Sequence, residues 1–188
     1  TGIVQDIGSL LRKVPSGQGA RLVISTRLPM DEVKLGDSIA VCGACLTVVR
    51  KASGLFEADI SRETADRSTL FNARAGEKLH LERAMRLQDR LDGHLMMGHV
   101  DGVGTVSKRE EQNDSLYLEV SAPENVRRYL VEKGSIAMHG VSLTVNSVAP
   151  DGFGVTLVPY TRALTFLDEL TVGSRVNLEA DLIGKYVE

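Results

Sequence analysis

The sequence SIAVCGACLTV (residues 38–48) returns as SIAMHGVSLTV (residues 135–145), a shift of 97 positions. The same shift carries GEKLHLE (76–82) onto GSRVNLE (173–179). A register that holds over most of the chain indicates a duplicated domain rather than a short-period solenoid. Two similar pockets in one chain suit a protein that handles two similar molecules.

The bulk composition of the 188 residues is ordinary, with 43% hydrophobic and 25% charged residues and a formal net charge of −3. The length and the repeat predict two small domains, residues 1–92 and 93–183. The negative charge and the low aromatic content, without Trp, argue against a nucleic-acid partner. No apolar run is long enough to span a membrane. Two cysteines in a chain without a signal peptide predict a cytoplasmic location.

Most apolar segments are short, β-branched and bounded by Gly, Asp or Asn, which is typical of strands. Six recur in each half, and this predicts an all-β fold of two tandem barrels, because closure removes exposed sheet edges. The expected strands are Ile3–Ile7, Ala20–Ser25, Ser38–Val41, Leu46–Val49, Leu55–Ile60 and Lys78–Arg83, then Val100–Val106, Leu116–Val120, Ser135–Met138, Leu143–Val148, Gly154–Val158 and Arg175–Glu179.

Helices are expected to be few and short. Pro123 can occupy a first helical turn, and helical spacing continues to Lys133, where Gly134 ends it. A shorter counterpart is expected from Pro29 to Lys34. Residues 184–188 are expected to begin a C-terminal helix that the sequence breaks off.

Cys42 and Cys45 have Cys-x-x-Cys spacing. A redox dithiol normally opens a helix, whereas this pair lies between two short strands. A zinc site would need further ligands; His80 or His139 could be recruited, but no second Cys pair exists and the spacing does not require either histidine.

The repeat matches Cys45 with Ser142, and each is followed two residues later by a threonine. On a strand, Thr47 therefore points to the same side as Cys45, and Thr144 to the same side as Ser142. Each half offers a thiol or hydroxyl pair on one face. The alternative is that these groups only satisfy the backbone of the turns.

The motif GIV (2–4) returns as GHV (98–100), so that Ile3 in the first half becomes His99 in the second. Imidazole moves protons near neutral pH. If both halves bind related ligands, only the second holds this acid–base group. Lys133 adds a cation, unless it is simply a solvated helix end, and His94 could orient the junction.

Six motifs together carry a resemblance to the riboflavin synthase alpha chain family. They run in order from end to end and include the duplication: GDSIA (36–40), CLTV (45–48), GHL (93–95), GHVDG (98–102), GVSLTVN (140–146) and KYVE (185–188). The resemblance implies two six-stranded Greek-key barrels, each binding one 6,7-dimethyl-8-ribityllumazine. It also implies a dismutation, in which one lumazine gives four carbons to another and yields riboflavin and 5-amino-6-ribitylaminouracil.

The resemblance implies no metal and no organic cofactor. It implies a homotrimer assembled through a C-terminal helix, with catalysis where the N-terminal barrel of one subunit faces the C-terminal barrel of another. Lumazine synthase is a further expected partner. The family's opening Met-Phe and the helix after Glu188 lie outside this sequence.

Site residues follow by matching positions to the family. The catalytic candidates are Cys45, Thr47, His99, Ser142 and Thr144. The substrate-binding candidates in the first barrel are Gly2, Ile3, Val4, Ser38, Leu46, Asp59, Ile60, Ser61, Arg62, Glu63 and Thr64. Those in the second are Gly98, Val100, Lys133, Leu143, Thr156, Leu157, Val158, Pro159, Tyr160 and Thr161.

The working hypothesis pairs these groups within each barrel. His99 with Ser142 would serve one ring, and Cys45 with Thr47 the other. Backbone groups of the strands at Asp59 and Thr156 would pair with the edge of the pteridine, as an added strand does.

Three positions depart from the family pattern. Cys42 lies where Asn is usual, His80 replaces an Asn, and His139 replaces an Asp just before Gly140. No role is transferred to these three residues.

The main rival is a lumazine- or flavin-binding optical antenna of the same double-barrel kind, which binds without turnover. Such proteins tend to lose the Cys-Leu-Thr and Ser-Leu-Thr elements, and both are intact here. A third reading, a structural or nucleic-acid-binding barrel, has little support from charge and aromatic content.

Overall fold

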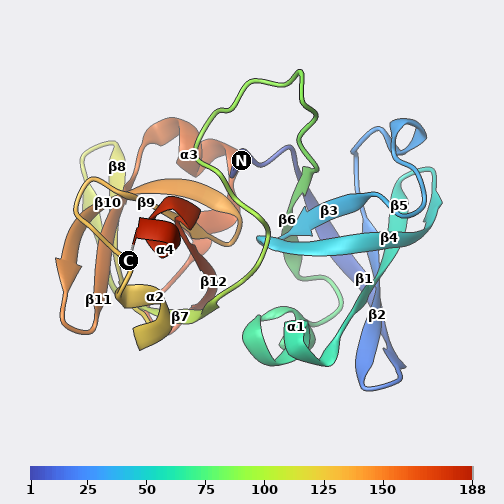
Figure 1. Cartoon of the computed structure of the whole chain (residues 1–188), viewed down its shortest axis with the longest axis horizontal. Helices are drawn as coiled ribbons and strands as arrows, with labels where there is room; N and C mark the ends of the chain where they lie inside the picture. Colours follow the sequence, from blue (N-terminus) through green and yellow to red (C-terminus); the bar gives the residue numbers. More distant parts are fainter. Residues whose placement is uncertain (188) are drawn as a thin grey trace.

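In the computed structural model, which describes residues 1–187, the strands close into two antiparallel barrels that lie side by side (Figure 1). The first barrel contains β1 (Asp6–Ser16), β2 (Gly19–Ser25), β3 (Ser38–Val41), β4 (Ala44–Ala52), β5 (Leu55–Ile60) and β6 (Lys78–Arg83). The second contains β7 (Gly102–Gln112), β8 (Ser115–Ser121), β9 (Ser135–Met138), β10 (Val141–Ala149), β11 (Gly152–Leu157) and β12 (Arg175–Ala180).

The two barrels have the same strand order. In the first, the order is β1-β2-β5-β4-β3-β6, and the second repeats it as β7-β8-β11-β10-β9-β12. Each barrel has its own core of alternating inward side chains, with Phe56 and Leu22 fully buried in the first and Leu116 and Leu118 in the second. The sequence prediction of two six-stranded barrels is confirmed, whereas the domain limits at residues 92 and 183 stay a prediction.

The first strand of each barrel differs from the expectation. Strands were expected from Ile3 and from Val100, but β1 begins at Asp6 and β7 at Gly102. The reason is that the residues before each strand leave their own barrel. Val4 packs against the core of the second barrel, and Val100 packs against the core of the first. The N-terminal end accordingly lies beside the second barrel in Figure 1.

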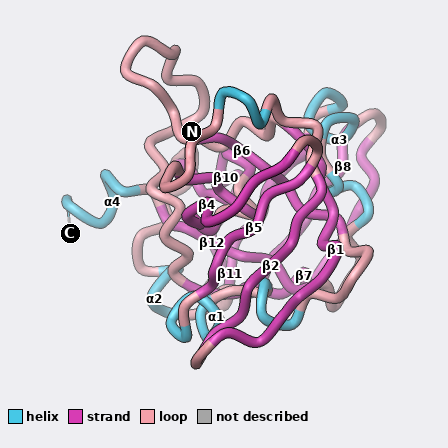
Figure 2. Tube along the Cα trace, turned by 90° about the vertical axis from the view of Figure 1, so that its right-hand side faces the viewer, coloured by secondary structure: helices cyan, strands magenta, loops and turns pink. Residues whose placement is uncertain are grey.

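Short helices lie around the barrels (Figure 2). They are α1 (Arg62–Arg67), α2 (Glu124–Arg127), α3 (Pro159–Leu164) and α4 (Leu182–Val187), with 3-10 turns at Met30–Glu32, Leu70–Asn72 and Phe166–Glu169. None of the helices in residues 1–187 is long and apolar enough to cross a membrane. The C-terminal helix begins two residues earlier than expected, and Glu188 lies outside the described residues.

The helix expected from Pro123 to Lys133 is wrong beyond Arg127. The amides of Tyr129 and Leu130 donate to carbonyls three residues back, as in a 3-10 turn. Lys133 then adopts a positive φ of 64° and donates its amide to the Val145 carbonyl. The chain must make this turn to enter β9, and it therefore cannot continue as a helix. The counterpart at 29–34 is likewise reduced to the turn Met30–Glu32.

The hairpins β3–β4 and β9–β10 turn at Cys42-Gly43 and His139-Gly140, where all four residues have positive φ. This is the backbone of a type I′ turn, in which Asn-Gly and Asp-Gly are preferred. The departures from the family pattern at these positions therefore exchange favoured turn residues for Cys, which adopts positive φ less readily, and for His, which tolerates it better.

Polar side chains join the barrels through reciprocal contacts. The Asn177 amide donates to the Cys42 carbonyl (2.9 Å) and accepts from the Thr69 amide (2.7 Å). At the equivalent position of the first barrel, His80 Nε2 accepts from the Phe166 amide (3.0 Å). Its Nδ1 therefore carries the proton and donates to the carbonyl of residue 139 (3.0 Å). The imidazole reproduces the donor and acceptor of the asparagine.

Acid is expected to weaken this junction. Burial lowers the pKa of His80 to about 3 and that of His139 to about 4, whereas histidines of the unfolded chain titrate near 6.5. The unfolded chain thus binds more protons in this range, and the free energy of unfolding falls as the pH drops from about 6.5 toward 4. In His80→Asn we expect a weaker pH dependence, because an amide does not titrate there.

Urea unfolding at several pH values measures this effect. His99→Asn, at an exposed side chain, is the matched control and should keep the full acid loss. Equal pH dependence in wild type and His80→Asn would contradict the assignment.

Candidate active site

The segments that precede β1 and β7 are exchanged between the barrels. The Gly2 carbonyl accepts from the Ser142 amide of the second barrel (2.9 Å). Reciprocally, the Gly98 carbonyl accepts from the Cys45 amide of the first barrel (2.7 Å). Through these bonds Gly2 contacts the second barrel and Gly98 the first, whereas Ile3 lines a cavity with Ser38 of the first barrel. The assignment of residues 2–4 to the first pocket and of residues 98–100 to the second stays a prediction. The repeat gives matching positions, but it does not say which barrel a segment contacts.

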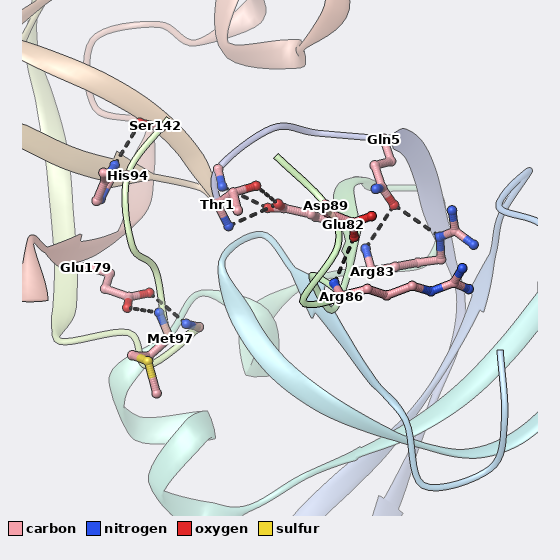
Figure 3. A network of polar contacts seen from close by, with 12 residues as sticks. Thr1, Gln5, Glu82, Arg83, Arg86, Asp89, His94, Met97, Ser142 and Glu179 are labelled. Atoms are coloured by element: carbon pink, nitrogen blue, oxygen red, sulfur yellow. Dashed lines mark hydrogen bonds and ion pairs between the residues drawn. The ribbon is translucent and has the colours of Figure 1, made fainter. Parts of the chain in front are cut away.

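Two buried carboxylates anchor the exchanged segments. Glu82 on β6 accepts from the Gly2 amide (3.0 Å). Glu179 on β12 accepts from the amides of Met97 (2.7 Å) and Gly98 (3.0 Å) (Figure 3). Burial raises the pKa of Glu179, and the two amide donors oppose that rise. Sequence reasoning missed both residues, although their spacing of 97 at the ends of GEKLHLE and GSRVNLE was a usable signal.

The outer faces of the two short hairpins carry the reactive side chains. In the first barrel, Ser38 pairs with Thr47 and Ala40 with Cys45 across β3 and β4. The Cys45 and Thr47 side chains are exposed, whereas their neighbours Ala44 and Leu46 are buried. Alternation along the strand thus places thiol and hydroxyl on one face, as their spacing predicts.

The second barrel repeats this arrangement, with Ser135 opposite Thr144 and Ala137 opposite Ser142. Some predicted contact residues point inward instead. Leu46, Ile60, Leu143 and Leu157 are core side chains, so only their backbones could contact a ligand.

A cavity of about 390 Å³ brings together several predicted residues of the first barrel and of the exchanged segment. Cys45 and Ala44 lie on one side of it, and Glu63, Thr64 and Arg67 of α1 on another; Gly98, His99, Val100 and Asp101 complete the lining. His99 therefore shares a cavity with Cys45 rather than with Ser142. The crossing of residues 98–100 brings the two together, and the expected pairing of His99 with Ser142 stays a prediction.

Cys45 also borders a second cavity of about 270 Å³. Ser38 and Ala40 form its barrel wall, and the loop after β6 contributes Leu91, Leu95 and Met97. Leu91, Leu95 and Met97 are between 42% and 52% exposed. The outer face of β3 and β4 is thus enclosed by apolar side chains on one flank and by charged groups of α1 on the other. Such a mixed lining suits a flat apolar ring that carries a polar chain.

The ends of β5 and β11 lead directly into α1 and α3. Asp59 forms a two-pronged ion pair with Arg21 (2.7 and 2.8 Å), and this hydrogen bonding lowers the pKa of Asp59. The Ser61 hydroxyl accepts from the Thr64 amide and caps α1, with Arg62 and Glu63 in its first turn. In the second barrel, Thr156 lies on β11, Pro159 opens α3 after Val158, and Tyr160 and Thr161 follow.

Ser142 has a partner that was not predicted. His94 Nδ1 lies 2.7 Å from the Ser142 hydroxyl (Figure 3). Burial lowers the pKa of His94, so the ring is neutral at pH 7. Lys133, also assigned to this pocket, is exposed, and its part in the pocket stays a prediction.

The two cysteines are free and differ in burial. Cys42 is enclosed in the core, and burial raises the pKa of its thiol to about 12. A thiol that stays protonated is neither a redox group nor a metal ligand. Among residues 1–187, no three His, Cys, Asp or Glu side chains are grouped to hold a metal ion.

Comparison with known proteins assigns the class. The lumazine binding domain family matches this chain twice, at residues 1–84 and 97–181. Over its full length the chain is 44% identical to riboflavin synthase of Mycobacterium tuberculosis, covering 96% of that relative. It is 38% identical to riboflavin synthase of Bacillus subtilis, again over its full length and 87% of the relative. The chain belongs to the riboflavin synthase family of tandem lumazine binding domains.

Solved structures support the same class. The complex of LumP with 6,7-dimethyl-8-(1'-D-ribityl) lumazine aligns with a TM-score of 0.84 at 27% identity, over 96% of this chain and 98% of that one. The complex of LumP with riboflavin aligns with a TM-score of 0.86 at 26% identity, over the same shares.

Gly98→Ala should damage this site. The added Cβ would lie 2.6 Å from the Cys45 Cβ and 2.9 Å from its amide, at a φ of +73°. Gly173→Ala is the matched control, because its φ is +93° and no atom lies within 4 Å of the added Cβ. We expect about 1–3 kcal/mol of destabilisation from backbone strain in the control. We expect a larger loss, with faster hydrogen exchange at the Cys45 amide, in Gly98→Ala.

Urea unfolding and amide exchange make the comparison. Equal losses in the two variants would show that residue 98 does not rest against Cys45.

Proposed function

We propose that the chain is a riboflavin synthase, which transfers four carbons between two molecules of 6,7-dimethyl-8-ribityllumazine. The products are riboflavin and 5-amino-6-ribitylaminouracil. The observation that carries the proposal is the duplicated reactive face, Cys45-Leu46-Thr47 and Ser142-Leu143-Thr144, in a chain that aligns over its full length with riboflavin synthases. Two identical molecules supply every atom of the products, so the reaction needs no external oxidant or carbon donor.

Positioning is the main contribution that two such pockets make. Holding two rings face to face replaces a dilute encounter by a high effective concentration, which lowers the barrier by up to about 7–11 kcal/mol when orientation is good. A proton must also leave the acidic methyl group of one ring, and a nucleophile must add to the other. These steps need only polar side chains close to the rings.

The geometry suggests a revised division of labour. His99 and Cys45 would serve the ring in the first pocket, with Thr47 on the same face. Ser142 and Thr144 would serve the ring in the second. The ribityl chain would extend toward the polar residues of α1, and the pteridine edge would pair with the backbone near Asp59.

Assembly follows as a further part of the proposal. The reactive faces of one chain belong to different barrels, so two rings meet when the first barrel of one subunit faces the second barrel of another. A homotrimer in the cytoplasm, with lumazine synthase as a further partner, suits this arrangement. The two free cysteines suit a reducing compartment.

An optical antenna is the second candidate, because the LumP complexes align closely with this fold. The two candidates differ in turnover rather than in binding.

Mixing the protein with 6,7-dimethyl-8-ribityllumazine should therefore produce riboflavin absorbance over time, with about half as many flavin molecules as lumazine molecules consumed. Binding without any change in absorbance would favour the antenna and contradict the proposal.

His99→Gln should lower kcat by about 10²-fold or more, the size expected for a group that transfers protons. The first cavity stays intact, because the backbone contacts of residues 97–100 do not use the imidazole. Steady-state kinetics with lumazine, and lumazine affinity as the control, measure this. A kcat near that of wild type would remove His99 from the mechanism.

A further inference from the structure

The hydroxyl of Ser142 makes a hydrogen bond with a buried histidine. His94 Nδ1 lies 2.7 Å from Ser142 Oγ, which is hydrogen-bond distance. The approach of the segment is close, because Gly93 has a φ of +73° and a Cβ there would lie 2.9 Å from the Ser142 Cβ. His94 itself is only 8% exposed. The left-handed conformation of Gly93 therefore lets the chain pass close to Ser142, and the His94 imidazole lies against the Ser142 hydroxyl (Figure 3).

The other ring nitrogen of His94 is unusual. Nε2 is buried and has no hydrogen-bond partner among residues 1–187. The ring is neutral, because burial lowers its pKa although Asp181 and Glu82 act in the opposite direction. A neutral imidazole carries one proton, on either Nδ1 or Nε2.

The absence of a hydrogen-bond partner for Nε2 among the described residues decides between these tautomers. A proton on Nε2 would leave a buried N–H without an acceptor, and unpaired buried N–H groups are rare in folded proteins. A proton on Nδ1 instead donates to Ser142 Oγ and leaves Nε2 as a bare acceptor. In that state the serine oxygen accepts from His94, and its own O–H is free to point away from the ring.

The equivalent side chain of the first barrel has a different environment among the described residues. Cys45, the counterpart of Ser142, is exposed, and no side chain among the described residues hydrogen-bonds its thiol. Within this chain, the two reactive faces are therefore alike in backbone but differ in how the reactive side chain is oriented.

We infer that His94 is a positioning residue, which orients the Ser142 hydroxyl as a hydrogen-bond donor toward a carbonyl oxygen or ring nitrogen of the substrate in the second pocket. This inference deepens the proposed function and rests on it. His94 acts through Ser142 and does not itself touch the substrate.

The tautomer can be tested without any turnover. Long-range ¹H–¹⁵N NMR of the ¹⁵N-histidine-labelled protein distinguishes a protonated Nδ1 from a protonated Nε2 at neutral pH, and His94→Asn identifies the signal by its loss. We expect Nδ1 of His94 to carry the proton. A proton on Nε2 overturns the inference, whether or not the protein makes riboflavin.

A matched set of variants tests the role in catalysis. The side-chain amide of Asn lies where Nδ1 lies, whereas that of Gln lies near Nε2. His94→Asn should therefore retain more activity than His94→Gln and His94→Leu. We expect the last two to lose about five- to tenfold in kcat/KM, the size of one ordinary hydrogen bond.

A double-mutant cycle separates positioning from packing. If His94 acts through Ser142, then His94→Leu in a Ser142→Ala background should cause no further loss of kcat/KM, even where thermal unfolding shows an added loss of stability. Fully additive losses, or equal activity of His94→Asn and His94→Leu, overturn the inference.

The proposed function is judged separately. Absence of riboflavin formation by the wild-type protein would end that proposal. In that case the variants are compared by their affinity for 6,7-dimethyl-8-ribityllumazine, where the same order, Asn above Gln and Leu, is expected. The reverse order would contradict the role of His94 independently of turnover.

Discussion

The exchange of two short backbone segments is the constraint on which the rest of the site depends. The carbonyls of Gly2 and Gly98 accept the amides of Ser142 and Cys45. The amides of the same glycines donate to Glu82 and Glu179. Each segment is thus held on both sides, by one barrel through a carboxylate and by the other through a strand. Removing either contact would leave a buried polar group unsatisfied, which is costly.

The two reactive faces share their backbone structure but differ in their chemistry. The backbone is alike around both reactive faces, so the differences lie in side chains alone. The first face carries an exposed thiol with His99 in its cavity, whereas the second carries a hydroxyl bonded to a buried imidazole. An enzyme that joins two copies of one molecule must treat them differently, because one gives carbons and the other receives them. Duplication followed by divergence of a few side chains provides this.

The sequence predicted the barrels well and the site only in part. Strand bounds such as Ser38–Val41 and Leu55–Ile60 were correct because short β-branched runs between turn residues have few alternative structures. The helix to Lys133 was overextended, because helical spacing does not reveal that its end must turn to meet β10. The proximity of His99 to Cys45 within the chain was not predicted for a similar reason: a repeat fixes equivalent positions but not long-range contacts.

One contact at the junction of the two barrels bears on the evolutionary origin of the chain. Gly43 and Gly140 face each other so closely that a Cβ on either would lie within 3 Å of the other's backbone nitrogen. The backbone contacts of Gly2 and Gly98 and the contacts of His80 and Asn177 are matched along the repeat, which is the pattern of an isologous interface between two identical subunits. The chain therefore has the form of a symmetric dimer of single-barrel ancestors, joined by gene fusion into one polypeptide. After fusion each copy mutates independently, which accounts for the different side chains at the two reactive faces.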